Sequence, residues 1–97
     1  MKRYALDSSF MINFLAGKES AAKEVRKLDS TDLIVPAPAR METERGVEDI
    51  GSFKDLEVEG FGLQQVEAAL RIIEHLKQKG DMIGIIDVMI ASIAATK

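Results

Sequence analysis

The sequence contains no cysteine and no tryptophan, and it has only one histidine and one tyrosine among its 97 residues. Without cysteine, the protein cannot form disulfide bonds, thiolate metal sites or a cysteine nucleophile. The sequence shows no recognisable Ser-His-Asp set, no zinc motif and no glycine-rich phosphate loop. The lone His75 is therefore expected on a helix surface.

Long apolar runs are absent as well. The longest run, residues 82–95, is interrupted by Gly84, Asp87 and Ser92 and falls short of the roughly 20 residues of a membrane span. A signal peptide is not predicted, because Asp7 interrupts the first apolar run almost at once. Together with the lack of cysteine, these absences predict a soluble, cytoplasmic protein.

The composition is that of an ordinary globular protein, with 46% hydrophobic and 30% charged residues. This length supports one hydrophobic core, so a single domain over residues 1–97 is expected. Sixteen acidic and thirteen basic residues give a net charge of −3. The total therefore carries no strong signature of nucleic-acid binding, although it says nothing about local basic patches.

Short apolar runs alternate with helical patterns, which predicts an α/β domain with a parallel sheet. The third strand is expected at a sheet edge, because Glu57 and Glu59 would be costly inside. Ser20 is expected to open the second helix and Gly80 to close the fourth. The predicted strands cover residues 3–6, 33–35 and 56–58, and the predicted helices cover residues 8–15, 21–28, 38–48, 63–79 and 87–96.

Three acidic residues stand where a strand ends or a helix begins. Asp7 closes the first strand, Glu42 lies in the first turns of the helix after the second strand, and Asp87 begins the last helix. If the first two strands are parallel neighbours, Asp7 and Glu42 emerge at the same edge of the sheet. Carboxylates gathered there would suit Mg²⁺ or Mn²⁺, which favour oxygen ligands, and a cation would relieve their mutual repulsion.

Each acid also has a purely structural interpretation. Asp7 and Asp87 are both good helix N-caps, and Glu42 could be a solvated acid near the favourable N-terminal end of a helix dipole. Considered one at a time, these roles explain Asp7 and Glu42 better than metal binding does.

The sequence resembles the PIN domains, and especially the short VapC-type toxins of bacterial and archaeal toxin–antitoxin pairs. Residues 4–12 (YALDSSFMI) are similar to the family's opening motif of an apolar strand, Asp, Ser or Thr, Ser and an apolar residue. Residues 34–36 (IVP) with 41–46 (METERG) are similar to its strand followed by Glu, three residues and Gly. Residues 86–94 (IDVMIASIA) are similar to the helix that carries its third acid. The resemblance implies a three-layer α/β/α fold around a short parallel sheet.

The resemblance also implies a metal-dependent endoribonuclease, with Asp7, Glu42 and Asp87 as the acids that bind Mg²⁺ or Mn²⁺ and a metal-activated water as the nucleophile. Glu44 is the weaker ligand candidate, because it lies on a different helix face from Glu42. Partners expected from the family are RNA, a second copy in a homodimer and a VapB-type antitoxin. Hydrogen bonds to a ligand carboxylate or bound water, or contacts to RNA phosphates, are expected from the following residues: Ser9, Arg40 and Arg45.

The sequence departs from the family pattern after the third-acid helix. Members normally continue into a further strand and a turn of the form Thr-x-Asn-x-x-Asp, whereas this sequence stops at Lys97. The fold is therefore expected to lack its last strand or strands, with the first strand left as an open edge and the last helix partly uncovered. Two other hypotheses stay open: a catalytically incomplete PIN-derived binding or assembly module, and an unrelated small α/β domain whose acids are all caps.

Overall fold

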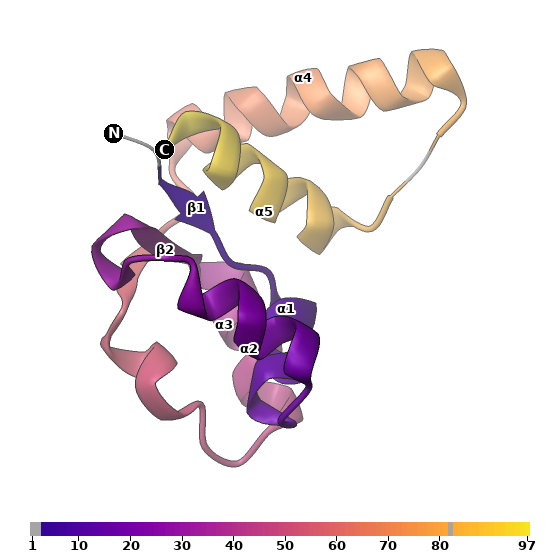
Figure 1. Cartoon of the computed structure of the whole chain (residues 1–97). Helices are drawn as coiled ribbons and strands as arrows, with labels where there is room; N and C mark the ends of the chain where they lie inside the picture. Colours follow the sequence, from indigo (N-terminus) through magenta and orange to yellow (C-terminus); the bar gives the residue numbers. More distant parts are fainter. Residues whose placement is uncertain (1–2, 82) are drawn as a thin grey trace.

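The computed structural model describes residues 3–81 and 83–97, so Met82, which begins the apolar segment before the last helix, lies outside it. Short strands alternate with helices along the chain (Figure 1). The order is β1 (Tyr4–Ala5), α1 (Ser8–Leu15), α2 (Glu19–Arg26), β2 (Leu33–Pro36), α3 (Ala37–Gly46), β3 (Glu57–Glu59), α4 (Leu63–Lys79) and α5 (Ile85–Thr96), with 3₁₀ turns at Ser30–Asp32 and Gly51–Asp55.

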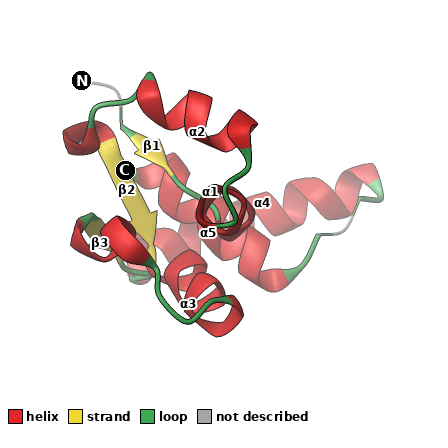
Figure 2. Cartoon of the chain, turned by 60° about the horizontal axis from the view of Figure 1, so that its bottom comes forward, coloured by secondary structure: helices red, strands yellow, loops and turns green. Residues whose placement is uncertain are grey.

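The sheet has three strands in the order β1-β2-β3, and both pairings are parallel (Figure 2). Tyr4 lies opposite Leu33, and Val35 lies opposite Val58. All residues of β2 are buried, as expected for a central strand covered on both faces. The predictions of parallel neighbours and of an edge position for β3 are confirmed. Within the described residues β1 pairs only with β2, so it forms the other edge.

Helices lie on both sides of the strands. In Figure 1 the α4–α5 hairpin lies above the strands, and α1, α2 and α3 lie below them. Helix α5 packs on β1 and β2, and α3 contacts β2, α1 and α5. Phe14 and Phe53 meet edge to face with ring centroids 5.3 Å apart, which packs the partly buried Phe14 against the core. The main core cluster consists of Leu6, Met11, Leu33, Val35, Ala39, Ile50 and Phe53.

Five predicted helix ends differ from the structure by one or two residues: both ends of α2, both ends of α3 and the start of α5. Helix α2 begins at Glu19 with Lys18 as its N-cap, so Ser20 lies inside its first turn. Helix α3 ends at Gly46 because Val47 is in extended conformation, with φ −138° and ψ 153°. Helix α5 begins at Ile85, with Gly84 at the cap position. Lys18 and Gly84 make no capping hydrogen bond through a side chain, so the side-chain preference on which these predictions relied does not set the starts of α2 and α5.

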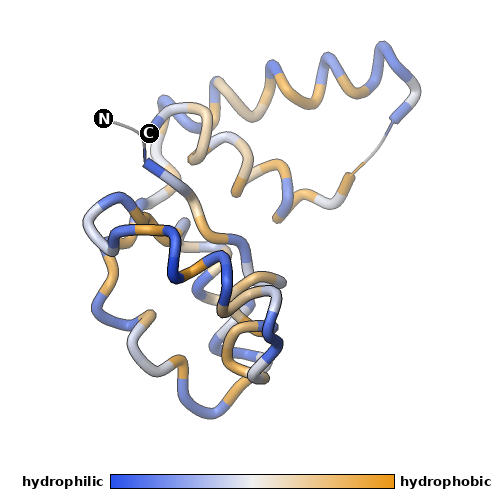
Figure 3. The backbone as a smooth tube through the Cα atoms, in the orientation of Figure 1, coloured by the Kyte–Doolittle hydropathy of each residue, from blue (hydrophilic) through white to orange (hydrophobic). Residues whose placement is uncertain are grey.

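Helix α4 matches its predicted bounds, and Gly80 ends it with a left-handed conformation at φ +75°. Its hydropathy alternates along its length, as expected for an amphipathic helix (Figure 3). Among the described helices, none is long and apolar enough to cross a membrane.

Polar contacts hold the α4–α5 hairpin to itself and to the sheet. The Gln65 Nε2 atom donates a hydrogen bond of 2.8 Å to Thr96 Oγ1, and Gln65 Oε1 accepts one of 2.9 Å from the Gly62 N–H. Lys97 pairs with Glu59 of β3, Nζ to Oε2, at 3.4 Å. The start of α4, the end of α5 and the edge strand β3 are thereby linked.

A second ion pair spans the sheet. The Arg3 guanidinium, just before β1, donates a hydrogen bond to the Glu57 carboxylate of β3, on the far side of β2. This contact lowers the pKa of the Glu57 carboxyl below its ordinary value. The pair therefore stabilises the fold at neutral pH, and its contribution is lost as the pH falls through the lowered pKa.

Replacement of Gln65 with Ala should destabilise the fold, because Gln65 is only 4% exposed and both ends of its side-chain amide are bonded. We expect a loss of about 1–3 kcal/mol, since the Gly62 N–H loses its partner. The measurement is urea unfolding followed by circular dichroism. Gln64→Ala is the matched control, because Gln64 is exposed on the same helix turn. Equal unfolding free energies for the two variants would contradict the assigned role of Gln65.

Candidate metal centre

Asp7 joins the end of β1 to the start of α1. Its backbone is extended, with φ −91° and ψ 167°, and its Oδ1 atom accepts a hydrogen bond of 2.7 Å from the Phe10 N–H. The capping role considered from the sequence is therefore confirmed. The cap uses only Oδ1, and no described residue donates a hydrogen bond to Oδ2. Capping and metal binding are thus compatible roles for the same side chain.

Glu42 lies on the face of α3 that meets α1. Its side chain is half-buried, and its Oε1 atom accepts a hydrogen bond of 3.0 Å from the Ser8 hydroxyl at the first position of α1. This is not the environment of a freely solvated helix acid. Its other oxygen, Oε2, accepts no hydrogen bond from the described part of the chain.

Asp87 lies in the first turn of α5 and is exposed. The cap position belongs to Gly84, so the alternative that made Asp87 an N-cap is wrong. No hydrogen bond or ion pair involves the Asp87 side chain within residues 3–81 and 83–97. A carboxylate here is favoured by the N-terminal end of the helix dipole.

Asp7 caps α1, Glu42 lies in α3 and Asp87 lies in α5, and α3 contacts both of the other helices. Within the described residues, none of the three carboxylates pairs with a lysine or an arginine. At least one oxygen of each carboxylate is therefore available, and the chemistry of these groups fits a hard divalent cation. Ser8, which follows Asp7 directly, is hydrogen-bonded to Glu42, but no described contact joins Asp87 to either of the other two acids. Among the residues described, no three His, Asp or Glu side chains are grouped so as to hold a metal ion.

A surface depression of about 290 Å³ lies over the contact between α1 and α3, and Ser8, Ile12, Glu42, Arg45 and Gly46 line it. It contains one acid, one hydroxyl group and one guanidinium group. A site of this composition can hold a cation at the acid and an anion at the arginine.

The two arginines that were predicted as RNA contacts differ in their surroundings. Arg40 Nε pairs with Glu44 Oε2 at 3.1 Å, so its charge is already compensated. Arg45 has no ion-pair partner in the described residues and lines the depression at Glu42. The ion pair with Arg40 also agrees with the prediction that Glu44 is a weaker ligand candidate than Glu42.

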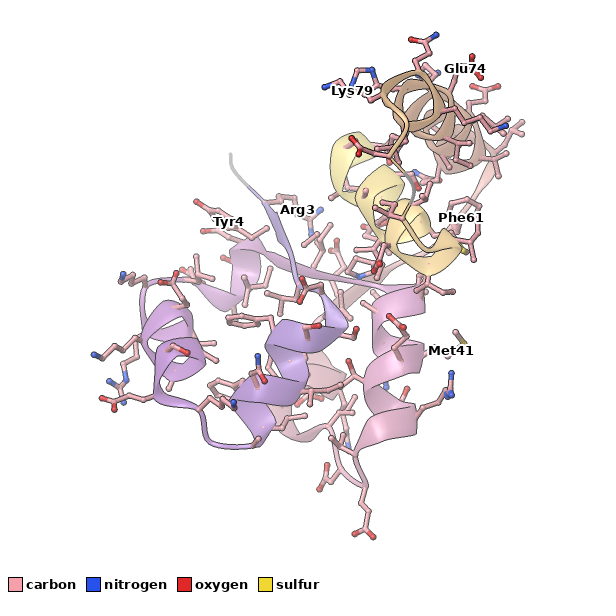
Figure 4. All side chains as sticks on the ribbon, turned by 90° about the vertical axis from the view of Figure 1, so that its right-hand side faces the viewer. Arg3, Tyr4, Met41, Phe61, Glu74 and Lys79 are labelled. Carbon is pink, nitrogen blue, oxygen red and sulfur yellow. The ribbon has the colours of Figure 1, made fainter. Side chains whose placement is uncertain are left out.

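A second depression, of about 480 Å³, lies between α3 and β3, and Arg45 lines this one too. Its apolar lining includes Met41 and Val58, which are 49% and 40% exposed. Met41 projects outward from α3, away from the core (Figure 4). The open face of α3 therefore continues from the polar depression at Glu42 to a more apolar surface.

The sequence selected Ser9 as the hydroxyl near the acids, but the structure places Ser8 against Glu42. Ser9 is exposed, and its hydroxyl bonds to no other described residue. The two residues are adjacent in the same helix and point in directions about 100° apart. Only the docking of α1 on α3 decides which of them faces Glu42, so the sequence carries no local signal for it.

The comparisons with known proteins agree with this fold. A model of the PIN domain matches residues 4–97, and the chain therefore belongs to the PIN domain family.

The fold is of the VapC type: a chain of the DNA-bound VapBC complex from Salmonella typhimurium superposes with a TM-score of 0.79 at 25% sequence identity. The match covers 97% of this chain and 80% of that chain. Among curated proteins, none matches this sequence.

Substitutions at Asp7 should separate its capping role from its charge. Asp7→Ala removes the acceptor for the Phe10 N–H and should cost about 0.5–2 kcal/mol of the free energy of unfolding. Asp7→Asn keeps an oxygen in the same place and should leave the unfolding free energy within about 0.5 kcal/mol of the wild type, since Asn caps as well as Asp. Chemical denaturation without metal measures both. Equal losses in the two variants would show that the charge, not the cap, stabilises α1.

Proposed function

We propose that the chain is a metal-dependent ribonuclease of the PIN type, in which Asp7, Glu42 and Asp87 bind Mg²⁺ or Mn²⁺. The observation that carries this proposal is the hydrogen bond from Ser8 to Glu42, because it joins the residue that follows Asp7 to the acid on the helix that follows β2. Among the described residues, none of the three carboxylates forms an ion pair with a lysine or an arginine, and this supports the proposal further.

Different residues would bind the cation and the substrate at such a site. Asp7 and Glu42 would hold the cation through the oxygens that their present hydrogen bonds leave open, and Asp87 would contribute from α5. A bound divalent cation would supply charge stabilisation for a phosphodiester and a more acidic water. Arg45 would contact a phosphate of the substrate, since its guanidinium group lines the same depression as Glu42.

We propose three partners for this chain. RNA is the substrate class expected for a nuclease of this family. A VapB-type antitoxin is supported by the likeness to a chain of a VapBC complex. A homodimer is the third, and the exposed Leu63 and Leu70 on α4 leave apolar surface for such a contact.

Cleavage of single-stranded RNA by the full chain tests the proposed activity. We expect cleavage with Mg²⁺ or Mn²⁺ and none in EDTA. Asp7→Asn, Glu42→Gln and Asp87→Asn should each lower the rate by more than about 100-fold, beyond the losses usual for the outer partners of a metal site. Glu44→Gln is the matched control on α3, because its carboxylate pairs with Arg40, and it should stay near the wild-type rate. Activity that persists in EDTA or in Asp7→Asn would refute the mechanism.

A binding or assembly module without catalysis is a second candidate function. It is favoured by the finding that no three acidic or histidine side chains in the described residues form a metal-holding group. The same assay distinguishes the two. If the wild type neither cleaves RNA nor binds Mn²⁺ but still associates with a partner chain, the module is the correct function.

The different surroundings of the two arginines generate a binding prediction. In EDTA, Arg45→Ala should weaken binding to single-stranded RNA and reduce the slope of log K against log salt by about 0.7, the value for one lost phosphate contact. Arg40→Ala is the control on the same helix and should change the slope little, because Arg40 is already paired with Glu44. Fluorescence anisotropy with a labelled oligonucleotide measures both. Identical slopes for the two variants would remove Arg45 from the proposed site.

A further inference from the structure

The contact between α1 and α3 carries an inference that rests on the proposed function and extends it. Ser8 Oγ donates a hydrogen bond of 3.0 Å to Glu42 Oε1. The two residues are 34 positions apart in the sequence, so this contact exists only because the two helices dock. It is the one hydrogen bond of the Glu42 carboxylate within the described part of the chain.

Ser8 is held firmly enough to orient another group. It directly follows Asp7, whose side chain caps α1 through the Phe10 N–H and whose carbonyl oxygen accepts from the Met11 N–H at 3.2 Å. Met11 is 1% exposed and belongs to the core cluster, so it fixes the helix against the body of the domain. The backbone at Ser8 is therefore anchored on both sides, by the cap at Asp7 and by the buried Met11.

The next turn of the same interface repeats the contact with apolar groups. Ile12 lies one turn after Ser8, and Gly46 lies one turn after Glu42. The Ile12 Cδ1 atom lies 3.5 Å from where a Cβ on Gly46 would stand, so the helices meet closely there. The Ser8–Glu42 bond is thus one of two successive contacts along a single helix–helix interface.

Glu42 needs such a partner because its side chain is long and only half-buried. An unrestrained glutamate samples several rotamers, and all but one are lost when the carboxylate binds an ion, which costs conformational entropy. A hydroxyl that holds Oε1 restricts the carboxylate in advance and leaves Oε2 for the ligand. Hydrogen-bonded partners of this kind orient metal ligands, and their loss typically costs about 10- to 100-fold in metal affinity or activity.

We propose that Ser8 is the positioning residue for Glu42, and that Ser9 has no part in the site. The Ser8 hydroxyl holds one oxygen of the carboxylate so that the other is presented to the divalent cation shared with Asp7. Ser8 itself does not contact the cation or the substrate.

Titration of the metal-free full chain with Mn²⁺, followed by electron paramagnetic resonance of the free ion, tests this role. Ser8→Ala should weaken Mn²⁺ affinity by about 10-fold or more. Ser9→Ala, the matched control, should stay within about twofold, since this hydroxyl bonds to no described residue. Ser8→Thr keeps the hydroxyl and should restore the affinity. In RNA cleavage, Ser8→Ala should lower kcat and leave KM near the wild-type value.

Thermal unfolding in EDTA shows whether each variant is folded. If Ser8→Ala does not fold, Ser8→Cys takes its place, because it keeps the size of serine but is a weak donor. Mn²⁺ affinity unchanged in the folded Ser8 variant, with affinity lost in Glu42→Gln, would overturn the role of Ser8 and leave the metal site intact. Equal losses in Ser8→Ala and Ser9→Ala would overturn it as well. A wild type that binds no Mn²⁺ would refute the proposed function, and the role of Ser8 with it.

Discussion

The central strand β2 is the constraint on which the rest of the structure depends. It is buried along its whole length and pairs in parallel with a strand on each side. Because parallel strands end at the same edge of a sheet, the cap of α1 and the start of α3 emerge together. Pro36 ends the strand, and α3 follows at once, with Pro38 in its first turn where a missing N–H costs nothing. The position of Glu42 relative to Asp7 is a consequence of this pairing.

The site is built in two parts with different support. Asp7, Ser8 and Glu42 belong to the α1–α3 contact, which packs directly on the core. Asp87 depends on the α4–α5 hairpin, which is tied down by Gln65 to Thr96 and by Lys97 to Glu59. The hydrogen-bonded oxygens of Asp7 and Glu42 stabilise the fold, and their other oxygens are available for ligands. The structural role of these side chains is therefore compatible with the metal-binding role proposed for them.

Much of the fold was predictable because its signals are local. The apolar period of α4 and the glycine after it defined that helix correctly, and the acidic residues of β3 indicated an edge strand. The predicted cap at Ser20 and the alternative that made Asp87 a cap were wrong, because Lys18 and Gly84 take the cap positions without a side-chain hydrogen bond. For the candidate site, the sequence indicated the acids but could not distinguish Ser8 from Ser9. It also could not show that Arg40 is paired and that Arg45 has no partner among the described residues.

The sequence by itself determined which segments form strands and helices, although not the residue at which every helix begins or ends. It placed Asp7 at a strand end and Glu42 on a helix, because short-range preferences act over a few residues along the chain. Only the tertiary structure decided which side of α1 faces α3, and hence that the Ser8 hydroxyl holds Glu42. That choice depends on how buried side chains such as Met11 pack against distant segments, and such packing cannot be read from either helix alone.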